Sequence, residues 1–230
     1  MDKIQIIEKL FYDIVTFSYL LLPLSLLFLR KSSDKSIPIL IALYGAFCFI
    51  SLYYFEHIPI NYRKYYYMSY TSIEYTTFAY LFYKNVQSTS FKKLIVVCSF
   101  LFILFQITYV LAFKIYRLDT IPIAFETILT FTYIVYFFYE FSKNILGFYI
   151  YNHYVFWIAT GILLYLGGSF FFYIMFNHLN EQQISAFGML TYVSEILKNI
   201  FFSVAIYTLI KHPVEKKNKS ETQIPFLDIV

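Results

Sequence analysis

The sequence predicts an all-α, multi-pass integral membrane protein built as one bundle of seven transmembrane helices, and three observations support this. Sixty per cent of its 230 residues are hydrophobic. Only 14% are charged, whereas about 25% is typical of soluble domains. Apolar stretches of about 20 residues, the length that crosses a bilayer as a helix, recur seven times. Because these stretches take up nearly the whole chain, we expect no separate soluble domain.

The stretches are joined by short polar links. Pro38 stands at the start of the second span, where the missing N–H of proline is harmless. Pro23 lies inside the first span and should kink it. Gly161, Gly167 and Gly168 in the sixth span would allow a neighbouring helix to approach closely. The spans are expected at about 9–29, 37–55, 65–83, 94–113, 121–141, 155–176 and 188–210, followed by a flexible tail over 211–230.

Lysine and arginine are distributed unevenly between the two sides of this bundle. Cytoplasmic loops of membrane proteins are enriched in these residues, and here one side carries roughly twice as many as the other. We therefore expect a protein of the cell membrane with its N-terminus outside and its C-terminus in the cytoplasm. The richer side holds Arg30, Lys31, Lys35, Lys84, Lys92, Lys93, Lys143 and the lysines of the tail, and the poorer side holds Lys3, Lys9, Arg63, Lys64, Lys114 and Arg117.

The tail begins with basic residues and ends in a segment that contains Ile224-Pro225-Phe226-Leu227. Two interpretations stay open. It is either a disordered segment that lies against lipid headgroups, or a docking peptide for a separate cytoplasmic protein.

Four charged side chains fall well inside the apolar spans, where a charge costs about 3 kcal/mol and normally faces protein or water. Counted from the outer ends of their spans, Glu74 and Lys198 lie roughly 15 Å deep, Glu195 roughly 10 Å and Glu126 roughly 8 Å. They belong to the third, fifth and seventh spans. At these depths they could line one pocket that is open to the outside.

Residues three or four positions apart lie on the same face of a helix, and polar side chains stand at this distance from the charged residues. Thr77 follows Glu74 by three residues, Thr130 follows Glu126 by four, and Asn199 follows Glu195 by four. The candidate residues for binding a ligand or ion are therefore Glu74, Glu126, Glu195, Lys198, Asn199, Thr77 and Thr130.

Two interpretations of the charges stay open. Glu195 and Lys198 are three residues apart and could form an internal ion pair that offsets their desolvation and fixes helix packing. Alternatively, the charges form a site for a ligand, an ion or a proton. Glu74 is the strongest candidate for such a site, because no basic residue lies within a turn of it on its own helix.

The sequence lacks the motifs of several enzyme classes. It has no phosphate-binding glycine loop, no G-x-S-x-G and no Cys/His pair, and the spacing of its histidines does not suit zinc. A membrane enzyme is therefore a weak alternative, and neither a metal site nor nucleic-acid binding is predicted. The four histidines, all in links or the tail, are His57, His153, His178 and His212.

Segments in the last third of the chain carry a resemblance. They are Phe156-Trp157-Ile158, Gly161-Ile162-Leu163-Leu164-Tyr165, Gly168-Ser169-Phe170-Phe171-Phe172, and Ser194 to Phe202. They resemble the sixth and seventh helices of largely uncharacterised bacterial seven-helix membrane proteins, which are related to the sensor modules of histidine kinases. The resemblance implies a sensing or signalling role. Since this sequence contains no kinase, it would signal through a separate cytoplasmic partner.

Lys198 and Glu74 also resemble a pair in microbial rhodopsins, which hold retinal on a lysine of helix 7 with a carboxylate of helix 3 as counter-ion. The resemblance would imply retinal on Lys198. The sequence departs from that family, because Glu195 stands three rather than four residues before the lysine. Of the aromatic and proline residues that line the retinal pocket in that family, little more than Trp157 is present.

A faint internal repeat supports a different alternative. Leu43-Tyr44-Gly45 is similar to Leu164-Tyr165-Leu166-Gly167, and an acid follows in the next span each time. Some transporters are built from such parallel repeats. The sequence therefore predicts a sensing module with an outward-facing polar pocket. A small transporter or proton-coupled carrier that uses the same acids is the alternative.

Overall fold

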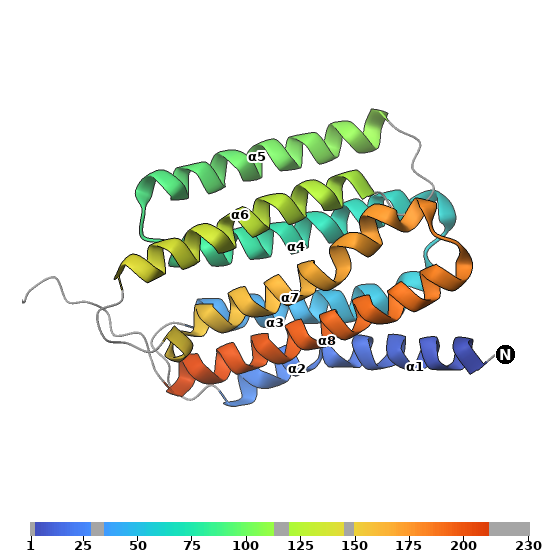
Figure 1. The fold of residues 1–230 in the computed structure, drawn as a ribbon, viewed down its shortest axis with the longest axis horizontal. Helices are drawn as coiled ribbons and strands as arrows, with labels where there is room; N and C mark the ends of the chain where they lie inside the picture. Colours follow the sequence, from blue (N-terminus) through green and yellow to red (C-terminus); the bar gives the residue numbers. More distant parts are fainter. Residues whose placement is uncertain (1–2, 29–34, 113–119, 145–149, 212–230) are drawn as a thin grey trace, which may run out of the picture.

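The computed structural model describes residues 3–28, 35–112, 120–144 and 150–211, and within these ranges every regular element is a helix. Seven of the helices are long and lie side by side along the long axis of the molecule (Figure 1). They are α1 (Lys3–Ser18), α3 (Ser36–Tyr54), α4 (Arg63–Asn85), α5 (Thr89–Ala112), α6 (Thr120–Asn144), α7 (Tyr154–Met175) and α8 (Glu181–Lys211). The short elements are α2 (Leu21–Leu24), η1 (Ser25–Phe28), η2 (Phe55–His57), η3 (Ile60–Tyr62), η4 (Ile150–Asn152) and η5 (Phe176–His178).

The helices match the expected spans closely, and six stretches are long and apolar enough to cross a membrane. The chain is thus a multi-pass membrane protein, and its described part is all helical. The helix that the composition does not identify as a span is α4, which is long enough but carries many tyrosines and charges. Three helices begin at least five residues earlier than expected, α1 at Lys3, α5 at Thr89 and α8 at Glu181, because segments that contain polar residues extend each helix before its apolar run. The predicted tail, from 212 onward, lies outside the described residues.

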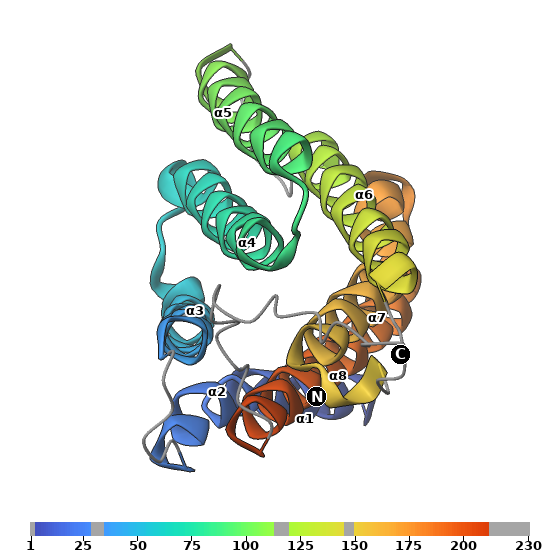
Figure 2. The same cartoon turned by 90° about the vertical axis from the view of Figure 1, so that its left-hand side faces the viewer.

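Two ends of the bundle can be distinguished (Figure 1). The N-terminal end holds the start of α1, the connection of α3 to α4 and that of α7 to α8. The C-terminal end holds the turn from α4 to α5 and the end of α8. Figure 2, in which the C-terminal end faces the reader, shows α5 at the periphery, where it packs against α4 and α6. Large apolar side chains such as Phe100 and Leu111 on α5 are well exposed, as lipid-facing residues are.

The first expected span is broken. Helix α1 ends at Ser18, and α2 begins only at Leu21. Pro23 explains the break, since it has no N–H for the carbonyl of Tyr19 four residues earlier and its ring crowds that carbonyl. Helix α3 approaches the break closely, because a Cβ on Gly45 would lie 2.7 Å from Cβ of Leu22 and 2.9 Å from the Tyr19 carbonyl oxygen. The break thus holds Tyr19 in the interior, where it is fully buried.

Helices α7 and α8 pack along one another through two glycines. A Cβ on Gly161 would lie 2.9 Å from Cβ of Phe201, and one on Gly168 would lie 2.6 Å from Cβ of Ser194. The prediction of a close helix approach is therefore confirmed at these two positions. It is wrong for Gly167, which faces open space.

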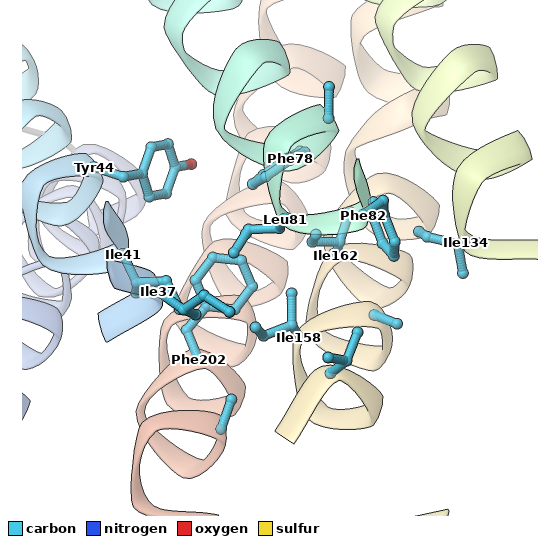
Figure 3. Packing of buried hydrophobic residues seen from close by; sticks show 14 of the residues in the cluster. Ile37, Ile41, Tyr44, Phe78, Leu81, Phe82, Ile134, Ile158, Ile162 and Phe202 are labelled. Atoms are coloured by element: carbon cyan, nitrogen blue, oxygen red, sulfur yellow. The ribbon is translucent and has the colours of Figure 1, made fainter. Parts of the chain in front are cut away.

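The half of the bundle toward the C-terminal end is filled by apolar side chains (Figure 3). They come from α3, α4, α6, α7 and α8 and are almost fully buried. We call this cluster the apolar plug. Its members include Ile37, Ile41, Phe78, Leu81, Phe82, Ile134, Ile158, Ile162 and Phe202.

Candidate functional site

An ion pair lies at the centre of the bundle. Nζ of Lys198 on α8 is 3.2 Å from Oε1 of Glu74 on α4, and the two residues are 0% and 5% exposed. Of the two interpretations left open, the ion pair of Lys198 with Glu195 inside α8 is not the one that forms, because the lysine reaches across to Glu74 on α4 instead. Glu74, which has no basic residue within a turn on its own helix, thus has its basic partner on α8.

Tyrosine hydroxyls complete the surroundings of both charges. The hydroxyl of Tyr44 donates to Oε1 of Glu74 at 2.6 Å, and that of Tyr165 donates to Oε2 at 3.1 Å. Lys198 also donates to the hydroxyl oxygens of Tyr44 at 2.7 Å and Tyr19 at 3.3 Å. Both carboxylate oxygens of Glu74 are thereby satisfied, and the ammonium has three acceptors, as a buried ion pair requires.

Glu195 joins the same arrangement through Tyr19. The Tyr19 hydroxyl accepts from Lys198 and donates to Oε2 of Glu195 at 3.1 Å. The lysine also lies over aromatic rings, 3.9 Å from the ring centroid of Tyr165 and 5.2 Å from that of Tyr44, at cation–π distance. We call this set of six residues the charge network. It consists of Tyr19, Tyr44, Glu74, Tyr165, Glu195 and Lys198, and it joins α4, α3, α7, α8 and the break after α1.

A cavity of about 870 Å³ extends from the N-terminal end of the bundle to the charge network. Glu8, Arg63 and Lys64 line it at the N-terminal end, and Glu74 and Glu195 line its inner part. Helix α4 runs from the N-terminal end of the bundle inward. The members of the apolar plug on α4 come after Glu74 in the sequence, so the plug lies beyond the inner end of the cavity. Among the described residues, the cavity therefore leads inward from one end only.

Glu126 and Gln106 line the same cavity and carry unsatisfied polar atoms. Glu126 is 4% exposed, and its Oε1 has no hydrogen-bond partner among the described residues. Gln106 is 1% exposed; its Oε1 accepts from the hydroxyl of Ser72, but its Nε2 likewise has no partner among the residues described. A buried polar atom without a partner is destabilising by about 1–3 kcal/mol. Two residues that line the cavity thus carry, within the described part of the chain, one buried acceptor and one buried donor without a partner.

The remaining predicted site residues lie elsewhere. Thr77 donates to the carbonyl of Ile73 on its own helix at 2.7 Å. Asn199 donates to the hydroxyl of Ser18 at 2.8 Å, which fastens α8 to the end of α1. Thr130 is fully buried on α6. None of these three residues is among the described residues that line the cavity. The structure thus brings Glu74, Glu195 and Lys198 together, with Glu126 on the same cavity.

Sequence reasoning missed the three tyrosines of the charge network. Most tyrosines of this chain stand near span ends, as in an interfacial belt, but Tyr19, Tyr44 and Tyr165 lie inside spans. A hydroxyl inside hydrocarbon needs a polar partner. That depth is the signal that could have found them, and the weak repeat around Tyr44 and Tyr165 marked two of them.

Lys198, on which the resemblance to microbial rhodopsins would place retinal, is 0% exposed, and its Nζ contacts Glu74 and Tyr44. Among the described residues, no group of three or more His, Cys, Asp or Glu side chains could hold a metal ion.

Comparisons of the chain with protein family models, with characterised proteins and with solved structures give no match. The function must therefore be argued from the cavity and the charge network.

Proposed function

We propose that this chain is a seven-span protein of the cell membrane that binds a small ligand from outside and signals its presence to a separate cytoplasmic protein. The N-terminal end of the bundle faces outward in this proposal, as the distribution of lysine and arginine favours. The observation that carries the proposal is the cavity, which is open at that end and stops at the charge network.

The proposal needs α4 to cross the membrane although its composition is polar. The position of α4 supports a membrane crossing, because α4 packs against α3, α5 and α6. Its acidic residue Glu74 and several of its hydroxyl groups are buried inside the bundle. Polar residues of membrane helices normally face the bundle interior in this way.

The charge network offers a physical route for a signal. A ligand that contacts Glu195 or Glu74 competes with Tyr19 and Lys198 for the same carboxylates. Helix α8 holds Glu195 and Lys198 and continues for more than a dozen residues to Lys211 at the C-terminal end. Small shifts of a rigid helix are a common way to transmit occupancy between two sites.

A carrier is the second candidate, because Glu126 has a buried oxygen without a partner among the described residues. A carboxylate in that state could exchange a proton during transport. This function would require the apolar plug to open toward the C-terminal end, since alternating access exposes one site to each side in turn.

Two measurements on one preparation test the proposal. A fluorophore on Lys211→Cys, in a Cys48→Ala and Cys98→Ala background, reports on the inner end of α8. Signalling through α8 predicts that Glu74→Gln changes its emission, whereas the exposed Asp13→Asn on α1 leaves it unchanged. An unchanged emission in Glu74→Gln would contradict the route through α8.

The same protein is then reconstituted in proteoliposomes, and the uptake of radiolabelled phenylethanolamine, alanine and glucose is measured. The sensing proposal predicts the same uptake as in empty liposomes. Uptake of any of the three above that background would overturn sensing in favour of a carrier.

A further inference from the structure

We infer that the cavity binds an organic cation, a protonated amine that carries a hydrogen-bond acceptor a few bonds from its nitrogen. This inference rests on the proposed ligand pocket but not on how the protein uses it. Three independent features of the cavity lead to it, namely its charge, its unsatisfied polar atoms and its aromatic walls.

The inner part of the cavity is acidic. Glu74, Glu126 and Glu195 line it, and the one ammonium beside them, Lys198, is fully buried behind Glu74. The basic residues that line the cavity, Arg63 and Lys64, are ten or eleven residues before Glu74 on α4, which is roughly 15 Å along a helix. Among the described residues, the inner part thus combines three acidic side chains with one buried ammonium, which contacts Glu74, so a cationic ligand would add a second positive charge beside the acids.

The two basic residues at the mouth are also engaged locally. The guanidinium of Arg63 lies 5.2 Å from the ring centroid of Phe55, and the ammonium of Lys64 lies 4.8 Å from that of Tyr65. Glu8 lines the same region and offsets part of their charge. Among the described residues that line the mouth, the basic charge is thus partly offset and engaged with aromatic rings.

The unsatisfied atoms specify the ligand further. Oε1 of Glu126 needs a donor, which an ammonium N–H supplies as a charge-assisted hydrogen bond. Nε2 of Gln106 needs an acceptor, and a hydroxyl or carbonyl oxygen close to the nitrogen would supply it. A simple metal cation would satisfy Glu126 but not Gln106.

Aromatic side chains form much of the wall, among them Tyr66, Tyr70, Phe172 and Tyr173. Ring faces attract organic cations, and the charge network already holds one ammonium in this way, over the ring of Tyr165. A volume of about 870 Å³ is large enough for a ligand with an aromatic or aliphatic body.

Three probes with one skeleton and different charges test the inference by calorimetry on protein in nanodiscs. Phenylethanolamine is cationic, phenylethanediol is neutral and mandelate is anionic. We expect phenylethanolamine to bind at least about tenfold more tightly than the other two, because a hydrogen bond to a charged group contributes about 1.5–3 kcal/mol. Equal or tighter binding of phenylethanediol or mandelate, or no binding of any probe, would overturn the inference.

Variants then locate the bound amine. Glu126→Gln should weaken the binding of phenylethanolamine about 10- to 100-fold. Phenethylamine lacks the hydroxyl of phenylethanolamine, and in Gln106→Leu the two amines should bind with the same affinity. Asp13→Asn, an exposed acid on α1 that does not line the cavity, serves as the matched control and should leave the affinity unchanged. Unchanged affinity in Glu126→Gln would contradict the assignment.

A protection experiment covers the case that Glu126→Gln fails to fold. Thr127 lines the cavity beside Glu126, and Thr127→Cys in the background without native cysteines can be modified by N-ethylmaleimide. Phenylethanolamine should slow the modification, and mandelate should not. Protection by mandelate alone would overturn the cation inference while leaving the pocket as a ligand site, so the two failures can be told apart.

Discussion

Replacement of Lys198 by methionine is the perturbation whose consequence the structure defines best. It removes an ammonium that lies 3.2 Å from the Glu74 carboxylate. At that distance and an effective dielectric constant of about 20, two unit charges attract by about 5 kcal/mol. Loss of one member of a buried pair typically destabilises a protein by about 3–5 kcal/mol, because the other charge stays buried alone. We expect about 3 kcal/mol, since Tyr44 and Tyr165 still donate to Glu74.

The free energy of unfolding is measured by titration of dodecyl sulfate into the protein in mixed micelles. Lys211→Met on the same helix is exposed and should change that free energy by less than about 0.5 kcal/mol. The double variant Lys198→Met with Glu74→Gln should return to within about 1 kcal/mol of the parent, because no charge is then left unpaired. A parent-like Lys198→Met, or a double variant less stable than either single variant, would show that the ion pair does not stabilise the bundle.

Three further predictions concern packing and pH. Gly168→Ala should destabilise by about 1–3 kcal/mol, because the new Cβ would lie 2.6 Å from Cβ of Ser194, whereas Gly167→Ala in open space should not; the same unfolding titration compares them. Phe202→Ala should cost about 3–5 kcal/mol by emptying part of the apolar plug, and a loss below about 1 kcal/mol would show that the plug is loosely packed. Burial lowers the pKa of His153 in the folded protein. The unfolded chain therefore binds a proton at His153 more readily than the folded protein does. The contribution of His153 to stability should thus fall as the pH decreases from about 7.5 to about 5.5. In unfolding titrations at both pH values, His153→Phe should lose that part of the pH dependence, and an identical dependence in parent and variant would contradict the assignment.

Hydropathy was sufficient to predict most of the helices, because a membrane span must be long, apolar and helical; α4, whose composition is polar, is the exception. Depth along the spans also placed Glu74 and Lys198 at one height, and the structure confirms that they meet. What depth cannot provide is the rotation of each helix about its axis. Helices α3 and α7 are apolar on almost every side, so periodicity says little about which face turns inward.

That missing rotation explains the specific errors. Within α8, the spacing of Glu195 and Lys198 favours a local pair, but in the structure Nζ of the lysine donates to Tyr44 at 2.7 Å and to Glu74 at 3.2 Å, both on neighbouring helices. Tyr19 could be placed only by knowing that the chain breaks four residues before Pro23 and that Gly45 lets α3 fit against the break. These are packing relations between segments far apart in the sequence.

The proposed function requires a cavity that opens outward and reaches the charge network, and access of thiol reagents to Thr71→Cys tests this most directly. Thr71 lines the cavity three residues before Glu74 on α4. In sealed vesicles of either orientation, without the native cysteines, we predict modification from the outer face only, and faster by a cationic than by an anionic methanethiosulfonate. Modification from the cytoplasmic face alone, or faster reaction with the anionic reagent, would contradict the account.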